Sequence, residues 1–169
     1  MARYNAWMNT RIYDVAGQLP PGELAAPRGA FFGSILGTLN HLVVADLIWL
    51  RRFASHRPSS LALEPVLRME APQALDQVLH TELEPLAAQR RAIDAAITGW
   101  VAALEPAELE EPLRYANTKG EPFCRPFGSL ILHFFNHQTH HRGQASTLLT
   151  QAGHDVGVTD LLVLIPSAG

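Results

Sequence analysis

The sequence predicts an all-α protein: an up-down-type four-helix bundle with a small β-hairpin between the third and fourth long helices and a short C-terminal segment. Three observations favour this class. Apolar side chains recur at helical spacing in several long stretches, proline and glycine separate those stretches, and a turn-like segment lies between two short runs. The chain has 169 residues and is expected to form one domain over residues 1–169, which is long enough to bury a core.

The first two helices are predicted from their apolar stripes and their end signals. The first stripe contains Tyr4, Trp7, Met8, Ile12, Val15, Ala16 and Leu19. Pro20 and Pro21 stop this helix, and a loop follows. Ser34 is a suitable N-cap for a second helix from about Ile35 to Ser55. The second helix is apolar on more than one side, so we expect it at the centre of the bundle.

The third helix is predicted between Pro72 and Leu104, after an irregular segment over residues 61–71. Its apolar positions are Leu75, Val78, Leu79, Leu83, Leu86, Ile93, Ile97 and Val101. Pro85 lies inside this span and should kink or split the helix, because proline lacks a backbone N–H and its ring clashes with the preceding turn.

A small hairpin is expected after the third helix. Residues 113–115 and 123–125 form two short runs around the turn-like segment 117–120, which ends in Gly120. Pro122 confines the second run to an edge strand, because proline cannot donate to a central strand pair.

The fourth helix is predicted from about Phe127 to Ala152. Pro126 opens it, and Gly153 follows as the residue that closes it. The tail from Asp160 to Ile165 is apolar and should pack as a short helix or an extended segment.

Charge and composition argue against nucleic-acid binding and favour a homodimer. The net charge is −3 and no basic cluster exceeds a pair of arginines, whereas nucleic-acid binding needs a basic face that displaces counterions. Charged residues make up 17% of the chain, and this low fraction favours a homodimer that covers some apolar surface. We therefore expect no nucleic-acid partner. We separately expect a small-molecule substrate, whose identity the sequence leaves open.

The cellular compartment is also suggested by composition. The single cysteine, Cys124, excludes an internal disulfide and fits a reducing compartment. The first residues show no apolar signal segment. The longest apolar stretch, residues 35–50, is too short and too polar to span a bilayer. These features predict a soluble cytoplasmic protein without a membrane partner.

Histidines cluster on the fourth predicted helix. His133, His137 and His141 follow one another at steps of four, so they form a slowly drifting stripe, and His140 points away from it. Two ligand nitrogens on one zinc ion lie only about 3 Å apart. Both 133/137 and 137/141 are therefore possible ligand pairs, and spacing alone leaves the choice open.

A pair of histidines needs a third ligand from another helix. His41 is the remaining histidine that periodicity places in a helix core, and Gly37, Thr38, Val44 and Ala45 leave space beside its ring. A buried histidine bonded to a backbone carbonyl is the alternative interpretation. No glutamate lies between the paired histidines, so the HExxH signature of zinc proteases is absent.

These residues carry a resemblance to a known family over nearly the whole chain. The matching stretches read YNAWMN at 4–9, GTLNHL at 37–42 with its continuation to Leu50, and FNHQTHHRGQ at 135–144. The chain resembles the DinB-like (DinB/YfiT) family, whose HxxxHRGQ pattern it contains in full. The resemblance implies a four-helix bundle, homodimers, and a divalent metal, zinc or nickel, on His41, His137 and His141. It also implies kinship to thiol-dependent transferases and isomerases.

The expected function is a metal-dependent enzyme in which a three-histidine site activates water or a thiol, as in a thiol-transferase, an isomerase or a hydrolase. Gln144 lies on the ligand face and is expected either to support the site or to contact the substrate, or else simply to lie on the surface. The alternative is a non-catalytic dimeric interaction protein with a structural or vestigial metal site.

Overall fold

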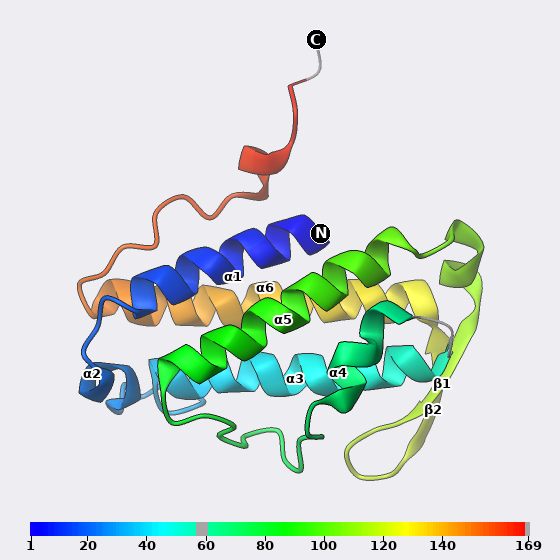
Figure 1. Cartoon of the computed structure of the whole chain (residues 1–169), viewed down its shortest axis with the longest axis horizontal. Coiled ribbons are helices and arrows are strands. Elements are labelled where there is room, and N and C mark those ends of the chain that lie inside the picture. The colour runs from blue at the N-terminus through cyan, green and yellow to red at the C-terminus, as the bar shows by residue number, and fades with distance from the viewer. Residues whose placement is uncertain (57–60, 168–169) are drawn as a thin grey trace.

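The computed structural model describes residues 1–56 and 61–167, and these residues are mostly helical. The longest helices of this part are α1 (Ala2–Ala16), α3 (Ile35–His56), α5 (Leu83–Ala102) and α6 (Phe127–Gln151). Helix α1 packs against α5 and α6, and α3 packs against the same two helices (Figure 1). None of the helices in the described ranges is long and apolar enough to cross a membrane.

The starts of the long helices show how local chemistry sets their bounds. Ser34 caps α3 as predicted, because its Oγ accepts a hydrogen bond of 3.0 Å from the Gly37 N–H. Helix α5 begins at Leu83 rather than near Pro72, so Pro85 lies in the first turn, where proline is tolerated, and it does not split the helix. Helix α6 matches its prediction, and Gly153 follows it with a φ of 87°.

The connections hold short helices that the periodicity did not predict. Helix α2 (Pro21–Ala25) lies in the first loop, while η1 (Leu61–Leu63) and α4 (Glu64–Arg68) occupy a segment that was expected to be irregular. Leu63 and Val66 are buried, so this segment adds to the core. Helix α3 ends at His56, one residue after the predicted Ser55, and the segment 57–60 that follows lies outside the described residues.

Helices α3 and α5 run in the same direction along the molecule, because the segment after α4 returns along α3 before α5 begins (Figure 1). The alternating up-down order expected from the sequence therefore does not hold for this pair. The returning segment, residues 69–82, lies against the N-terminal half of α3, where Asn40 Oδ1 accepts bonds from the backbone N–H groups of Leu79 and His80.

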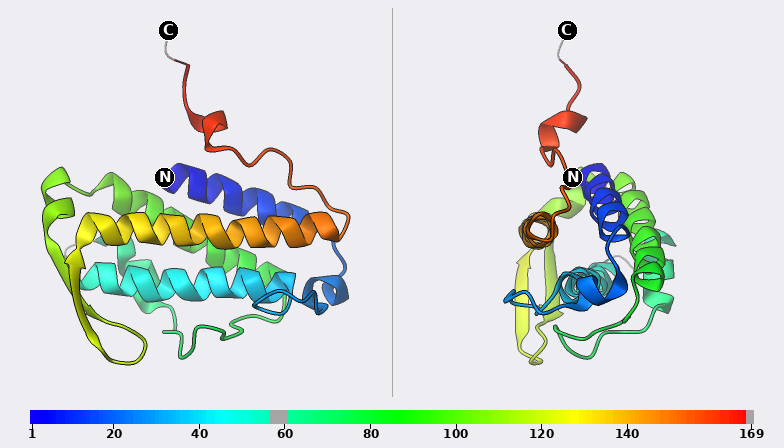
Figure 2. Two further views of the ribbon diagram at one scale, coloured as in Figure 1. Left: turned by 180° about the vertical axis from the view of Figure 1, so that it is seen from behind. Right: turned by 90° about the vertical axis from the view of Figure 1, so that its left-hand side faces the viewer.

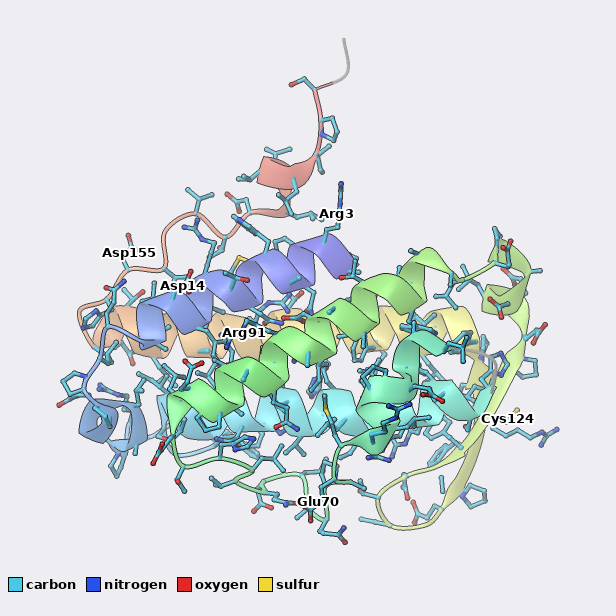
Figure 3. The ribbon with its side chains drawn as sticks, in the orientation of Figure 1. Arg3, Asp14, Glu70, Arg91, Cys124 and Asp155 are labelled. Atoms are coloured by element: carbon cyan, nitrogen blue, oxygen red, sulfur yellow. The ribbon has the colours of Figure 1, made fainter. Side chains whose placement is uncertain are left out.

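The predicted hairpin is present and consists of β1 (Pro112–Ala116) and β2 (Pro122–Pro126), which pair antiparallel with Leu113 opposite Arg125. It lies on the side of α3 and α6 that faces away from α1 and α5 (Figure 2). Leu113 is buried and Arg114 is exposed, as alternation along a strand requires. Cys124 is exposed opposite Arg114 (Figure 3).

The core is built largely from aromatic and branched side chains. The Phe53 ring stacks on Trp100 at a centroid distance of 5.2 Å and meets the edges of Phe127 and Phe134 at 5.4 and 5.7 Å. These rings join α3, α5 and α6 at the end of the molecule that carries the hairpin.

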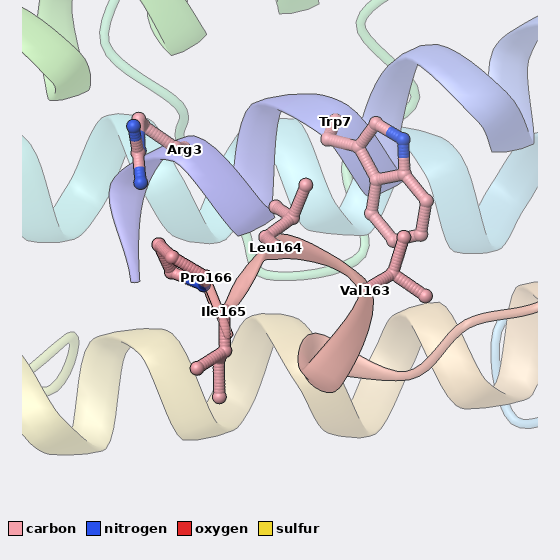
Figure 4. Close-up of a pocket in the computed structure, with 6 residues that line it drawn as sticks. All are labelled: Arg3, Trp7, Val163, Leu164, Ile165 and Pro166. Carbon is pink, nitrogen blue, oxygen red and sulfur yellow. The ribbon is translucent and has the colours of Figure 1, made fainter. Parts of the chain in front are cut away.

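The C-terminal tail forms η3 (Leu161–Leu164), but it packs less than expected. It extends away from the helices (Figures 1 and 2), and Leu162 is 74% exposed. Its contact with the body is narrow. Val163 and Leu164 border a cavity of about 390 Å³ next to Trp7 of α1 (Figure 4).

Candidate metal centre

The structure brings His41 of α3 together with His137 and His141 of α6. One ring nitrogen from each histidine lies within 4.8 Å of the others. The Nε2 atoms of His41 and His141 are 3.3 Å apart, and the His137 ring centroid lies 5.3 and 4.4 Å from those of His41 and His141. These are the three residues that the family resemblance selected.

Oxygen atoms orient two of the three imidazoles. His41 Nδ1 lies 2.9 Å from the Leu75 carbonyl oxygen, and His141 Nδ1 lies 2.7 Å from Gln144 Oε1. Both oxygens accept hydrogen bonds, so each neutral ring carries its proton on Nδ1 and leaves a lone pair on Nε2. The two Nε2 lone pairs then face each other, an arrangement that a shared cation would stabilise.

Electrostatics keep these rings neutral. Burial, together with the neighbouring His141 and His41 rings, lowers the pKa of His137 to about 3. Burial also lowers the pKa of His41 and of His141 below the ordinary value. Because metals bind the neutral imidazole, a lowered pKa reduces the competition between protons and a metal ion.

Phe32 fills the space that the small residues near His41 were expected to leave open. Its ring stacks on His41 with centroids 3.7 Å apart and lies edge-on to His141 at 5.5 Å. Gly37 permits this approach, since a Cβ at that position would lie 2.0 Å from the Phe32 carbonyl oxygen. Phe32 was not predicted as part of the site, and its only signal in the sequence is an aromatic residue between two glycines in the loop before α3.

The other histidines of α6 lie outside the cluster. His133 faces Trp49, with ring centroids 5.1 Å apart, and its ring is 6.1 Å from that of His137. His140 is exposed, and its Nε2 lies 3.4 Å from Gln144 Nε2. The 137/141 pair, rather than 133/137, therefore meets His41.

A buried polar cluster behind the histidines holds α6 in place. Gln138 and Arg142, each next to a histidine of the site, donate hydrogen bonds to Asp46 of α3 and to Asn5 of α1. Arg90 Nη1 of α5 donates to Asp46 Oδ2 at 2.6 Å and forms a second ion pair with Asp94 at 2.9 Å. Burial raises the pKa of Asp46 to about 6, although Arg90 favours the carboxylate. This cluster sets the rotation of α6.

Comparisons with known proteins agree with these features. The model of the DinB family matches residues 1–168. Protein DinB of Bacillus subtilis (strain 168) is 28% identical over 159 residues, which cover 93% of this chain and 87% of that protein. No solved structure matches the chain significantly. On the family match over nearly its full length, the chain belongs to the DinB family.

Proposed function

We propose that His41, His137 and His141 bind one divalent transition metal, zinc or nickel, and that the protein is a metal-dependent enzyme of the thiol-transferase, isomerase or hydrolase type. The observation that carries the proposal is the pair of oriented rings whose Nε2 atoms lie 3.3 Å apart, with His137 beside them. Imidazole nitrogens are preferred ligands of both metals.

The chain's own residues suit an open site. Three protein ligands are typical of catalytic zinc, and within the described residues the cluster holds His41, His137 and His141 without a further histidine, cysteine or carboxylate. A metal held there would lower the pKa of bound water or activate a thiolate. Leu75 and Gln144 fix the ring orientations, and Phe32 shields one face of His41 from water.

Replacement of single histidines tests the metal site. His41→Ala should abolish stoichiometric metal, as measured by elemental analysis of protein purified without a histidine tag. His133→Ala is the matched control, because His133 belongs to the same stripe of α6 but faces Trp49, and it should retain the metal. Stoichiometric metal in His41→Ala would rule out His41 as a ligand.

The competing function is a non-catalytic interaction protein with a structural metal. Exposed apolar side chains favour it, among them Leu132 at 71% and Leu162 at 74% exposure. Chelation separates the two functions, because a structural metal contributes folding free energy and its removal should cost much of the thermal stability. The enzyme that we propose should lose little stability and should bind thiols at the metal.

We also propose that the four long helices form a four-helix bundle, that the protein is a cytoplasmic homodimer, and that it acts on a small molecule rather than on nucleic acid or membranes. The contacts of α1 and of α3 with both α5 and α6 support the bundle, and the single Cys124 fits a reducing compartment. The low charged fraction supports the dimer, and the net charge of −3 argues against a nucleic-acid partner. Sedimentation velocity at micromolar concentration tests the dimer.

A further inference from the structure

A continuous row of rings leads from the histidine cluster to the hairpin. Its members come from the loop before α3, from α3 and α6, and from the hairpin, and neighbouring centroids are between 3.7 and 6.1 Å apart. In order, its members are Phe32, His41, His137, His133, Trp49, Tyr115 and Phe123. The proposed metal ligands occupy one end, and His133 and Trp49 connect them to the other.

The hairpin end of the row contains a cavity of about 380 Å³. Its lining consists of Trp49, Tyr115, Arg125, Ser129, Leu130 and His133. Arg125 lies opposite Leu113, the buried residue of β1, so its side chain is on the hairpin face that looks toward the helices. Beside the cavity, the Arg52 guanidinium lies over the rings of Trp49 and Tyr115, at 4.7 and 5.1 Å from their centroids.

These two arginines are not neutralised by carboxylates. Among the described residues, Arg125 and Arg52 have ring partners and no ion pair, whereas Arg90 is paired with Asp46. A larger cavity of about 590 Å³ lies on the other side of the site, but its arginine, Arg28, forms an ion pair of 2.7 Å with Glu23. Among the described residues at these two cavities, the guanidinium groups without an ion pair therefore lie at the hairpin end.

We propose that the cavity beneath the hairpin binds the carboxylate end of the substrate, an elongated organic anion with a flat apolar middle whose reacting end reaches His41, His137 and His141. Guanidinium groups match a carboxylate in geometry and charge, and the faces of Trp49 and Tyr115 suit a flat apolar body. The proposal rests on the proposed function, because the substrate's other end is defined by the metal site.

The test uses two probes that differ only at the far end: 4-(mercaptomethyl)benzoate and 4-(mercaptomethyl)benzyl alcohol. Each is titrated calorimetrically into Co²⁺-loaded full-length protein, and Co²⁺ uptake is measured separately. The carboxylate probe should bind at least about tenfold more tightly, as one charge-assisted contact implies. Arg125→Gln and Arg52→Gln should each remove most of this preference while the alcohol probe binds as before.

Arg114→Gln is the matched control, since Arg114 lies on the same hairpin but on its exposed face. It should change the affinity of the carboxylate probe by less than about twofold. The subsite would be overturned by equal binding of the two probes to the unaltered protein, or by a loss of preference in Arg114→Gln as large as in the other two variants. If Co²⁺ uptake is normal in that case, the proposed metal site still stands. Failure to take up Co²⁺ would instead overturn the proposed function, and the subsite with it.

Discussion

Replacing Gln144 by leucine should weaken metal binding about tenfold without unfolding the protein. Gln144 Oε1 lies 2.7 Å from His141 Nδ1, and leucine removes this acceptor because its side chain is apolar and ends one atom short of the glutamine amide. One hydrogen bond contributes about 0.5–1.5 kcal/mol net, and the upper end of this range corresponds to about tenfold in affinity. Mutating a residue that hydrogen-bonds a metal ligand typically weakens metal affinity about 10- to 100-fold. We expect the lower end of this range, because the side chains of His141 and Gln144 are partly exposed and water can replace the lost oxygen.

Competition with a chromogenic chelator measures this affinity directly. Gln144→Glu keeps an acceptor on His141 and should bind the metal at least as tightly as the unaltered protein. Gln151→Leu, at an exposed position on the same helix, should leave the affinity unchanged. Unaltered metal affinity in Gln144→Leu would refute the role of Gln144 in orienting His141.

The remaining predictions concern stability. Asp46→Ala removes the 2.6 Å partner of the buried Arg90, which keeps its ion pair with Asp94, so the substitution should cost about 1.5–3 kcal/mol in denaturant unfolding. The exposed pair of Arg91 with Glu84 is the comparison, and Arg91→Gln should cost less than about 1 kcal/mol. The metal-free protein should lose thermal stability as the pH falls below about 6.5, because the unfolded chain takes up a proton that folded His137, with its pKa of about 3, does not. His137→Gln should reduce the slope of melting temperature against pH between pH 7 and 5. An identical slope in this variant and in the unaltered protein would contradict the prediction. Gly37→Ala should cost about 1–3 kcal/mol in the same denaturant assay, because its Cβ would lie 2.0 Å from the Phe32 carbonyl oxygen and force the loop off His41; unchanged stability would show that the loop adapts freely.

The fold was predictable wherever the signal is local. The cap at Ser34, the hairpin turn and the helix end at Gly153 each depend on a few neighbouring residues, and the structure agrees with them. The third helix was predicted to begin too early, because Leu75 and Val78 continue its apolar spacing although both are exposed.

Tertiary hydrogen bonds explain why the segment before α5 is not a helix. The Leu75 carbonyl accepts from His41, and the N–H groups of Leu79 and His80 donate to Asn40, so backbone groups that a helix would pair internally are used by α3. Asn40 therefore links a helix to this extended segment. Periodicity within the segment carries no information about such partners.

The choice between the two histidine pairs shows the same dependence on distant residues. Spacing alone allowed 133/137 and 137/141, because every step of four along α6 has the same geometry. Asp46 and Asn5 hold Gln138 and Arg142 in the core, and this contact directs the adjacent His137 and His141 toward His41. Each four-residue step rotates by about 40°, so His133 has drifted away from His41 and faces Trp49 instead. The residues that select the proposed ligands are therefore buried side chains outside the histidine cluster.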